Sequence, residues 1–210
     1  MTLRHPGTLA GRLVTLEPLA MEHHDGLVAA TEDGEMWRLT YTRIPSPDEM
    51  RDEIRRRLRL QDEGGMLAFT ARRTDTGAII GMTTFMNIDA SVPRVEIGST
   101  WNAESSHGTG TNPESKLLLL RHAFEVWECS AVEFRTDFFN RPSREAIERL
   151  GAKQDGILRA HTRLPAGYVR DTVVFSITRA EWPGVRVGLE ARVLRHVEAA
   201  SPDSGSPRLG

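Results

Sequence analysis

Two closely spaced glycines ahead of a strongly helical segment form the first candidate binding site. Residues 105–112 read SSHGTGTN, with Gly108 and Gly110 at the centre. Glycine lets the backbone approach a ligand closely, and the first N–H groups of a following helix attract phosphate oxygens. Asn112 is expected to cap that helix, with Pro113 in its first position. The loop is therefore predicted to bind a phosphate or pyrophosphate through the backbone of Ser106, His107, Gly108, Thr109, Gly110 and Thr111.

Three kinds of phosphate-binding loop can be compared with this stretch. A Walker A loop has glycine directly before its lysine, but Ser115 precedes Lys116 here. A dinucleotide-binding fingerprint needs Gly or Ala three residues after Gly110, where this chain has Pro113. The remaining form is the shorter x-x-G-x-G loop that binds the pyrophosphate of acyl-coenzyme A. A plain strand-to-helix turn is the alternative.

A carboxylate and a thiol are the other groups whose chemistry stands out. Glu96 lies in the strand that leads into the glycine loop, so its carboxylate could take a proton from an amine through water. The alternative for Glu96 is a salt-bridged strand residue. Cys129, the only cysteine, has no evident paired base and is expected to be a buried structural residue. His23 and His24 lack a second pair of ligands at metal spacing and are expected on a solvated helix, so no metal site is predicted.

The composition excludes several classes of function. The chain has 210 residues, with 29 acidic and 27 basic side chains and a net charge of -2, which argues against a dedicated nucleic-acid binder. A single cysteine excludes an intramolecular disulfide framework. No apolar run approaches the roughly 20 residues of a membrane span, and the N-terminus lacks the apolar stretch of a signal peptide. We expect a cytoplasmic protein that does not bind membranes.

The hydrophobic pattern predicts the elements that must position these residues. Leu117, Leu120, Phe124 and Trp127 recur at helical spacing after the glycine loop, which predicts a buried helix face with Lys116 and other charged residues outside. The basic residues of 51–59 alternate with acids and are expected on a salt-bridged helix surface. Strands are expected at 12–17, 67–73, 79–87, 93–101, 132–138, 156–162 and 168–178, and the other helices at 20–31, 47–63, 144–150 and 179–197, the last bent at Pro183. Three consecutive strands favour a mixed α/β sheet in one domain over 1–198, followed by a disordered tail at 199–210.

Several motifs in a fixed order resemble one protein family. They are the strand Val95–Gly98, the loop Gly108–Asn112 with the helix start Glu114–Leu120, the strand end Arg135–Asn140, the helix Ser143–Ala152, and the short sequences Arg170–Thr172 and Glu181–Pro183. Over residues 10–183 the chain resembles the GNAT superfamily of N-acetyltransferases, in the branch of ribosomal-protein-alanine N-acetyltransferases. The resemblance implies the GNAT fold, a mixed, mostly antiparallel sheet of six to seven strands with one splayed pair and helices on both faces.

The resemblance also implies acetyl-CoA as donor, direct transfer to an amine, and roles for particular residues. Ile97, Gly98 and Ser99 would pair through their backbone with the pantetheine arm, and Asn140 would hydrogen-bond it. Glu96 would act as the base. Many family members have a proton-donating tyrosine where this chain has Ile147, so Ser143, one turn earlier, becomes the candidate to stabilise the leaving thiolate. The acceptor would contact Trp37, Arg38 and Tyr41, with His161 and Asp171 as further candidates.

Two departures from the family pattern keep other functions open. Ser105 stands where the family loop usually has Gln or Arg, and His107 is also unusual beside the glycine. Together with Ile147 they leave an inactive acyl-CoA-binding module as the alternative to an enzyme. A nucleotide-binding protein is the third possibility. The acceptor is either a protein N-terminus or a small-molecule amine, and a homodimer is possible.

Overall fold

A single mixed sheet organises the chain. The computed structural model describes residues 6–40, 42–164 and 167–200, and within them eight strands follow the order β1-β2-β3-β4-β5-β6-β8-β7. The strands are β1 Leu9–Ala10, β2 Val14–Pro18, β3 Met66–Arg73, β4 Ile79–Asp89, β5 Arg94–Asn102, β6 Ala131–Asp137, β7 Lys153–Arg163 and β8 Val169–Thr178. All neighbouring pairs are antiparallel except β5 with β6. The mixed, mostly antiparallel sheet is confirmed, and the eighth strand is the two-residue β1, too short to leave a sequence pattern.

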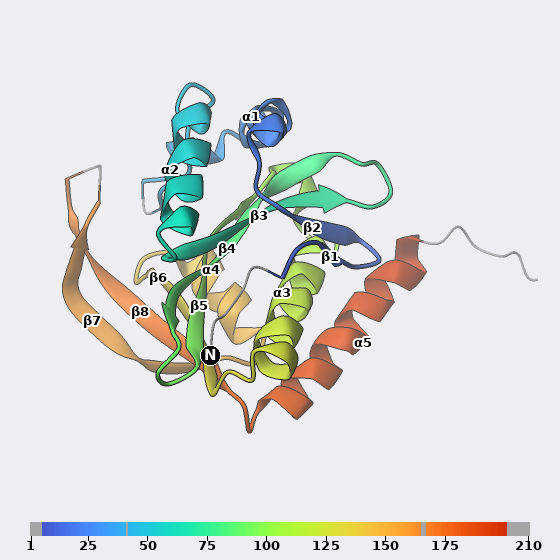
Figure 1. The fold of residues 1–210 in the computed structure, drawn as a ribbon, viewed down its shortest axis with the longest axis vertical. Coiled ribbons are helices and arrows are strands. Elements are labelled where there is room, and N and C mark those ends of the chain that lie inside the picture. The colour runs from blue at the N-terminus through green and yellow to red at the C-terminus, as the bar shows by residue number, and fades with distance from the viewer. Residues whose placement is uncertain (1–5, 41, 165–166, 201–210) are drawn as a thin grey trace, which may run out of the picture.

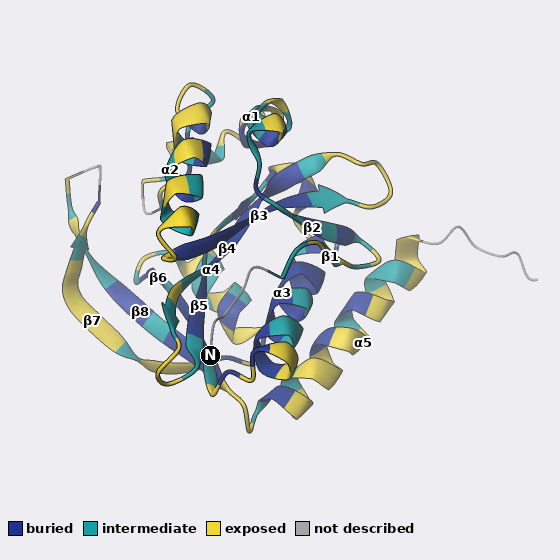
Figure 2. Ribbon diagram, in the orientation of Figure 1, coloured by how far each residue is buried: buried dark blue, intermediate teal, exposed yellow. Residues whose placement is uncertain are grey.

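Helices cover both faces of this sheet (Figure 1). They are α1 His24–Glu32, α2 Met50–Asp62, α3 Thr111–Arg121, α4 Arg141–Glu148 and α5 Trp182–Ala200. Leu27 of α1 and Ile54 of α2 pack with Ala68 of β3 in one core cluster. The larger cluster, on the opposite face, includes Phe69 of β3 and Leu189 of α5. Because residues 68 and 69 point to opposite faces of β3, the strand is buried on both sides, as Figure 2 shows.

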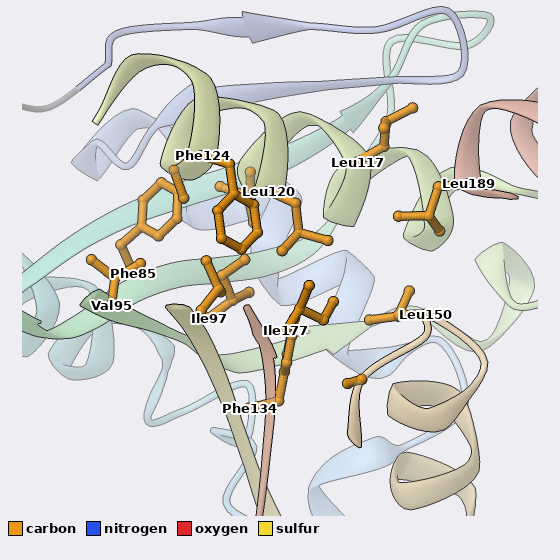
Figure 3. Packing of buried hydrophobic residues seen from close by; sticks show 14 of the residues in the cluster. Phe85, Val95, Ile97, Leu117, Leu120, Phe124, Phe134, Leu150, Ile177 and Leu189 are labelled. Carbon is orange, nitrogen blue, oxygen red and sulfur yellow. The ribbon is translucent and has the colours of Figure 1, made fainter. Parts of the chain in front are cut away.

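The helix after the glycine loop packs as its apolar spacing predicts. Leu117, Leu120, Phe124 and Trp127 are all buried, and Figure 3 shows Leu120 and Phe124 above Phe85 and Ile97 of the sheet. The prediction that Asn112 caps this helix is wrong. Gly110 is the N-cap, with φ of 88°, and the helix begins at Thr111. Lys116 was predicted on the outer face, but it is only 6% exposed.

Several other boundaries and environments differ from the sequence predictions. α2 begins at Met50, three residues late, after a turn over 47–49 in which Glu49 accepts hydrogen bonds from the Ser46 N–H and hydroxyl. α4 begins three residues early, at Arg141. α5 begins at Trp182, so Pro183 lies in its first turn and not at a bend. His23 is buried against Thr70, at 2.9 Å from the Thr70 hydroxyl to Nδ1, and not solvated.

The C-terminal helix extends further than expected. α5 includes residues 199 and 200, and the remainder of the predicted tail, 201–210, lies outside the described residues. Among the described residues, no helix is long and apolar enough to cross a membrane.

Candidate active site

The parallel pair β5 and β6 splays apart after three residues. Arg94, Val95 and Glu96 pair with residues 131–133, and no further pairing between these strands follows. From Ile97 onward one edge of β5 therefore has no strand partner among the described residues. A cleft of about 440 Å³ opens there between β5, β6, α3 and α4. Its walls include Glu96, Ile97, Gly98, Ser99, Thr100, His107, Asn112, Lys116, Arg135, Asp137, Asn140, Ser143 and Ile147.

The glycine loop lies at one end of this cleft and is braced by its own side chains. The Thr109 hydroxyl donates to the Ser106 carbonyl at 2.7 Å, and the buried Ser106 hydroxyl donates to the Ala103 carbonyl at 2.7 Å. Gly108 and Gly110 both have positive φ. The backbone N–H groups of residues 108, 110, 111 and 112 have no acceptor among the described residues. Four such groups beside a helix N-terminus suit a pyrophosphate.

The two glycines are required for different reasons. A Cβ on Gly110 would lie 2.6 Å from His196 of α5 and 2.8 Å from Leu13, so Gly110 is needed for packing within the protein itself. A Cβ on Gly108 would meet nothing within 4 Å. A substitution at Gly108 would therefore affect a ligand at this loop without a clash inside the protein, whereas one at Gly110 would also disturb the packing.

Glu96 occupies the point where the two strands separate. Its side chain is 7% exposed; the Asn87 amide donates to Oε2 at 2.7 Å, and Arg135 Nε lies 3.4 Å from the same oxygen. Burial raises the pKa of Glu96, although Asn87 and Arg135 oppose the shift. A Cβ on Gly98 would lie 2.8 Å from Glu96 Oε1, so glycine at 98 makes room for the carboxylate. A carboxylate with a raised pKa at a cleft is suited to accept a proton near neutral pH.

The α4 wall of the cleft carries Asn140, Ser143 and Ile147. Asn140 Oδ1 accepts the Ser143 N–H at 3.1 Å and caps α4. Ile147 is 9% exposed and can donate no proton. The Ser143 hydroxyl has no hydrogen-bond partner in the described part of the chain, which leaves it available to a ligand.

Lys116 reaches the cleft from α3. Its ammonium donates to the hydroxyls of Thr100, at 2.8 Å, and Thr83, at 3.3 Å. Burial lowers the pKa of Lys116 to about 7. The pattern of the glycine loop predicts no role for this residue. The available indication was its position directly before four leucines in a helix, where a lysine on the buried face must point into a cavity or find a partner.

A second cavity, of about 760 Å³, adjoins the first. It is lined by Trp37, Arg38 and residues of α2, and it shares Leu39, Thr42, Arg43, Ile44 and Ser99 with the cleft. The structure thus brings the predicted acceptor residues Trp37 and Arg38 to a cavity next to Glu96. Tyr41 lies outside the described residues.

Arg57 of α2 lines the second cavity and contacts Ser99, which lines both cavities. Both terminal guanidinium nitrogens donate to the Ser99 carbonyl at 3.2 Å, and Nε donates to Glu53 at 2.7 Å. The basic face over 51–59 was predicted to be a salt-bridged surface. That holds for Arg55 with Asp52 and Arg56 with Glu53, but Arg57 is 2% exposed. In the sequence nothing distinguishes Arg57 from the neighbouring arginines, so its burial could not be predicted.

His161 and Asp171 are not brought to either cavity. Asp171 Oδ1 accepts the Ala160 N–H at 2.7 Å, and Oδ2 pairs with Arg159 at 2.7 Å, so this carboxylate holds an irregular part of β7. His161 is exposed on β7 and is hydrogen-bonded to the hydroxyls of Thr172 and Thr162. We therefore leave both residues out of the acceptor site.

Cys129 lies in the core and away from the cleft. It is fully buried, as predicted, and burial raises the pKa of its thiol to about 11. Among the described residues, no group of three or more His, Cys, Asp and Glu side chains could hold a metal ion.

Comparison with known proteins gives one family match. A model of the acetyltransferase (GNAT) domain matches residues 13–153. No curated protein matches the chain.

Solved structures match over most of the chain. An acetyltransferase candidate from T. thermophilus is 34% identical, with a TM-score of 0.79, and the match covers 90% of this chain and 98% of that one. A GCN5-related N-acetyltransferase from Brucella melitensis is 25% identical, with a TM-score of 0.81 and coverage of 99% and 90%. An acetyltransferase from Salmonella typhimurium, which modifies the N-terminal serine of ribosomal protein L7/L12, shares the fold at 17% identity, with a TM-score of 0.71 and coverage of 81% and 98%.

Proposed function

The chain belongs to the GNAT family of acetyltransferases, and from this premise we propose that it transfers the acetyl group of acetyl-CoA directly to an amine. It is an acyltransferase enzyme. The observation that carries the choice of donor is the open edge of β5 beside a loop with four N–H groups that are unpaired in the described part of the chain. An extended pantetheine arm can pair with such an edge as an added strand would.

The donor is proposed to lie along the cleft with its pyrophosphate at the glycine loop. The N–H groups of residues 108 and 110–112 would bind the phosphate oxygens. The backbone of Ile97, Gly98 and Ser99 would pair with the pantetheine amides, and the Asn140 amide nitrogen would add a hydrogen bond. The thioester supplies an activated acetyl group, and no covalent acetyl-enzyme is needed because the amine attacks directly.

The acceptor amine is proposed to enter from the second cavity, past Trp37 and Arg38. Glu96 would take the proton that the attacking nitrogen loses, directly or through one water. Its raised pKa supports this role, since a carboxylate of ordinary pKa is a weaker base. On the opposite wall, the free hydroxyl of Ser143 would donate a hydrogen bond to the sulfur.

The acceptor is proposed to be a protein N-terminus or a small-molecule amine. The Salmonella protein supports a protein N-terminus as acceptor, through its fold alone. The second cavity is lined by both acidic residues and arginines, which suits a protein N-terminus as well as a small-molecule amine. A cytoplasmic location and a homodimer stay predictions from the sequence.

An acetyl-CoA consumption assay over a panel of peptides and small amines tests this function. We expect at least one amine to stimulate release of free thiol, and calorimetry to detect acetyl-CoA but not ATP. Binding of acetyl-CoA without turnover on any acceptor would favour the acyl-CoA-binding module instead. Binding of ATP alone would contradict the proposal.

A further inference from the structure

Lys116 carries a buried positive charge that no carboxylate neutralises. It is 6% exposed, and among the described residues its ammonium forms no ion pair. Its two hydrogen bonds go to the neutral hydroxyls of Thr83 and Thr100, which leaves one of its three N–H donors free. An isolated buried charge is costly, so such groups are found where a ligand or a reaction supplies the opposite charge.

The cleft is where that opposite charge would arise. Lys116 lines it from α3, and Ser143 and Ile147 of α4 line the same cleft. The other charged or titratable side chains on its walls are Arg43, Glu96, His107, Arg135, Asp137 and Arg170. Glu96 is already bonded to Asn87 and lies near Arg135, and His107 is exposed in the glycine loop. None of these carboxylates is within ion-pair distance of Lys116.

A positive charge near the sulfur and a proton for the departing thiolate both make the C–S bond of a thioester easier to break. Among the cleft residues, arginines hold their protons too tightly to donate them, and a serine hydroxyl is a poor acid. Lys116 combines a positive charge with a transferable proton, because burial lowers its pKa to about 7. A group whose pKa is close to the working pH is the most effective acid catalyst.

We propose that Lys116 stabilises the departing thiolate of acetyl-CoA and gives it a proton. The inference rests on the proposed function. The acceptor nitrogen uses its electron pair to form the C–N bond and loses a proton to Glu96. The C–S bond breaks and its electron pair stays on sulfur, which takes a proton from the Lys116 ammonium. Solvent then removes the proton from Glu96 and returns one to Lys116.

Three variants test this step. Lys116→Met removes the charge and the proton, Lys116→Arg keeps the charge but cannot donate, and Lys153→Met is the matched control. Lys116 and Lys153 are the only lysines of the chain, and Lys153 is 77% exposed on β7. We expect Lys116→Met to lower kcat by about 10²–10³-fold at pH 6, Lys116→Arg to lower it less, and Lys153→Met to leave it unchanged. Acetyl-CoA affinity should change by less than about threefold in all three variants, because the charge acts on the thiolate and not on the bound thioester.

The decisive readout is the pH dependence of the ratio of wild-type to Lys116→Met turnover. Taking a ratio cancels the titration of the acceptor amine. We expect the ratio to fall about tenfold per pH unit above about 7, as wild-type Lys116 loses its proton. A ratio independent of pH would overturn the proposal and leave Lys116 as a brace for Thr83 and Thr100.

A second readout does not need activity. With two lysines in the chain, side-chain NMR of Lys116 and Lys153 gives two resolvable titrations, assigned by the two Met variants. A Lys116 pKa near 7 supports the inference, and a value near that of an exposed lysine would overturn it. Failure of the wild type to bind or turn over acetyl-CoA would instead contradict the proposed function itself.

Discussion

Glu96 shows how one side chain acquires its chemistry from its neighbours. It is the last residue of β5 that pairs with β6, so its carboxylate lies where the strands part. Burial raises its pKa, and the Asn87 amide fixes one oxygen at 2.7 Å. Glycine at 98 keeps the space beside the other oxygen free. The carboxylate is thus both oriented and basic enough to accept a proton from an amine.

Replacing Glu96 with glutamine tests that role. Glu96→Gln should lower turnover by about 10²–10⁴-fold at neutral pH, because the amide cannot accept the proton. Wild-type turnover should rise with pH through the Glu96 pKa, which lies above its ordinary value of 4.5, and the variant should lose this rise. Steady-state rates across pH measure both effects, with acetyl-CoA affinity as the control. Near-normal turnover at every pH would show that Glu96 is structural.

At the scale of elements, an irregular segment of β5 connects α2 to the cleft. The register between β4 and β5 shifts at residues 82–84, and Ser99, in the segment opposite, has φ of 47°. Arg57 holds the Ser99 carbonyl from the α2 side, and Lys116 holds the Thr100 hydroxyl from the α3 side. Two buried cations therefore fix the strand edge that is proposed to pair with pantetheine.

Two neighbouring arginines, Arg57 and Arg56, allow a matched test of the contact between Arg57 and the Ser99 carbonyl. Arg57 and Arg56 both pair with Glu53, but Arg57 is 2% exposed and Arg56 is 36% exposed. Arg57→Met should lower the free energy of unfolding by about 3 kcal/mol, because it removes a buried guanidinium that pairs with Glu53, whose side chain is 11% exposed, and with the Ser99 carbonyl. Arg56→Met should cost less than about 1 kcal/mol. Denaturant unfolding measures both values, and equal losses would show that Arg57 acts only as a surface ion pair. In the folded Arg57→Met protein, KM for acetyl-CoA should also rise.

At the scale of the whole molecule, the fold could be predicted much further than the site. The positions of the seven longer strands and of the main core residues follow from alternation and helical spacing, which burial enforces directly. The predicted start of a helix was wrong where the backbone conformation of a single residue determines it. Gly110, for example, has a left-handed φ and is the N-cap of α3. The burial of Arg57 could not be predicted, since it depends on a contact with Ser99, 42 residues away. For Lys116 the position before four leucines was the one indication, and its partner Thr100 lies 16 residues away.

Burial of the charged Lys116 side chain should lower the free energy of unfolding of the protein. Its pKa is about 7 in the folded protein and 10.5 without burial. Below pH 7, Lys116 is charged in both the folded and the unfolded protein, and the folded protein bears the full free-energy cost of burying that charge. Between pH 7 and pH 10.5, Lys116 keeps its proton in the unfolded chain but loses it in the folded protein, so the free energy of unfolding of the wild type rises with pH.

Lys116→Met should therefore be more stable than the wild type, by on the order of 2–4 kcal/mol below pH 7, with the difference shrinking towards pH 10. Denaturant unfolding of both proteins from pH 6 to pH 10 measures it. A variant that is less stable at every pH would show that the ammonium is a net stabilising group, contrary to this account.

Calorimetry on two glycine variants measures whether acetyl-CoA binds at the glycine loop. Gly108 and Gly64 have φ of 76° and 78°, and a Cβ on either meets nothing within 4 Å. Valine therefore introduces the same backbone strain at both positions, but only Gly108 lies at the proposed pyrophosphate site. We predict that Gly108→Val weakens acetyl-CoA binding by about tenfold or more and that Gly64→Val leaves it unchanged. Equal affinities in the two folded variants would contradict the placement of the donor.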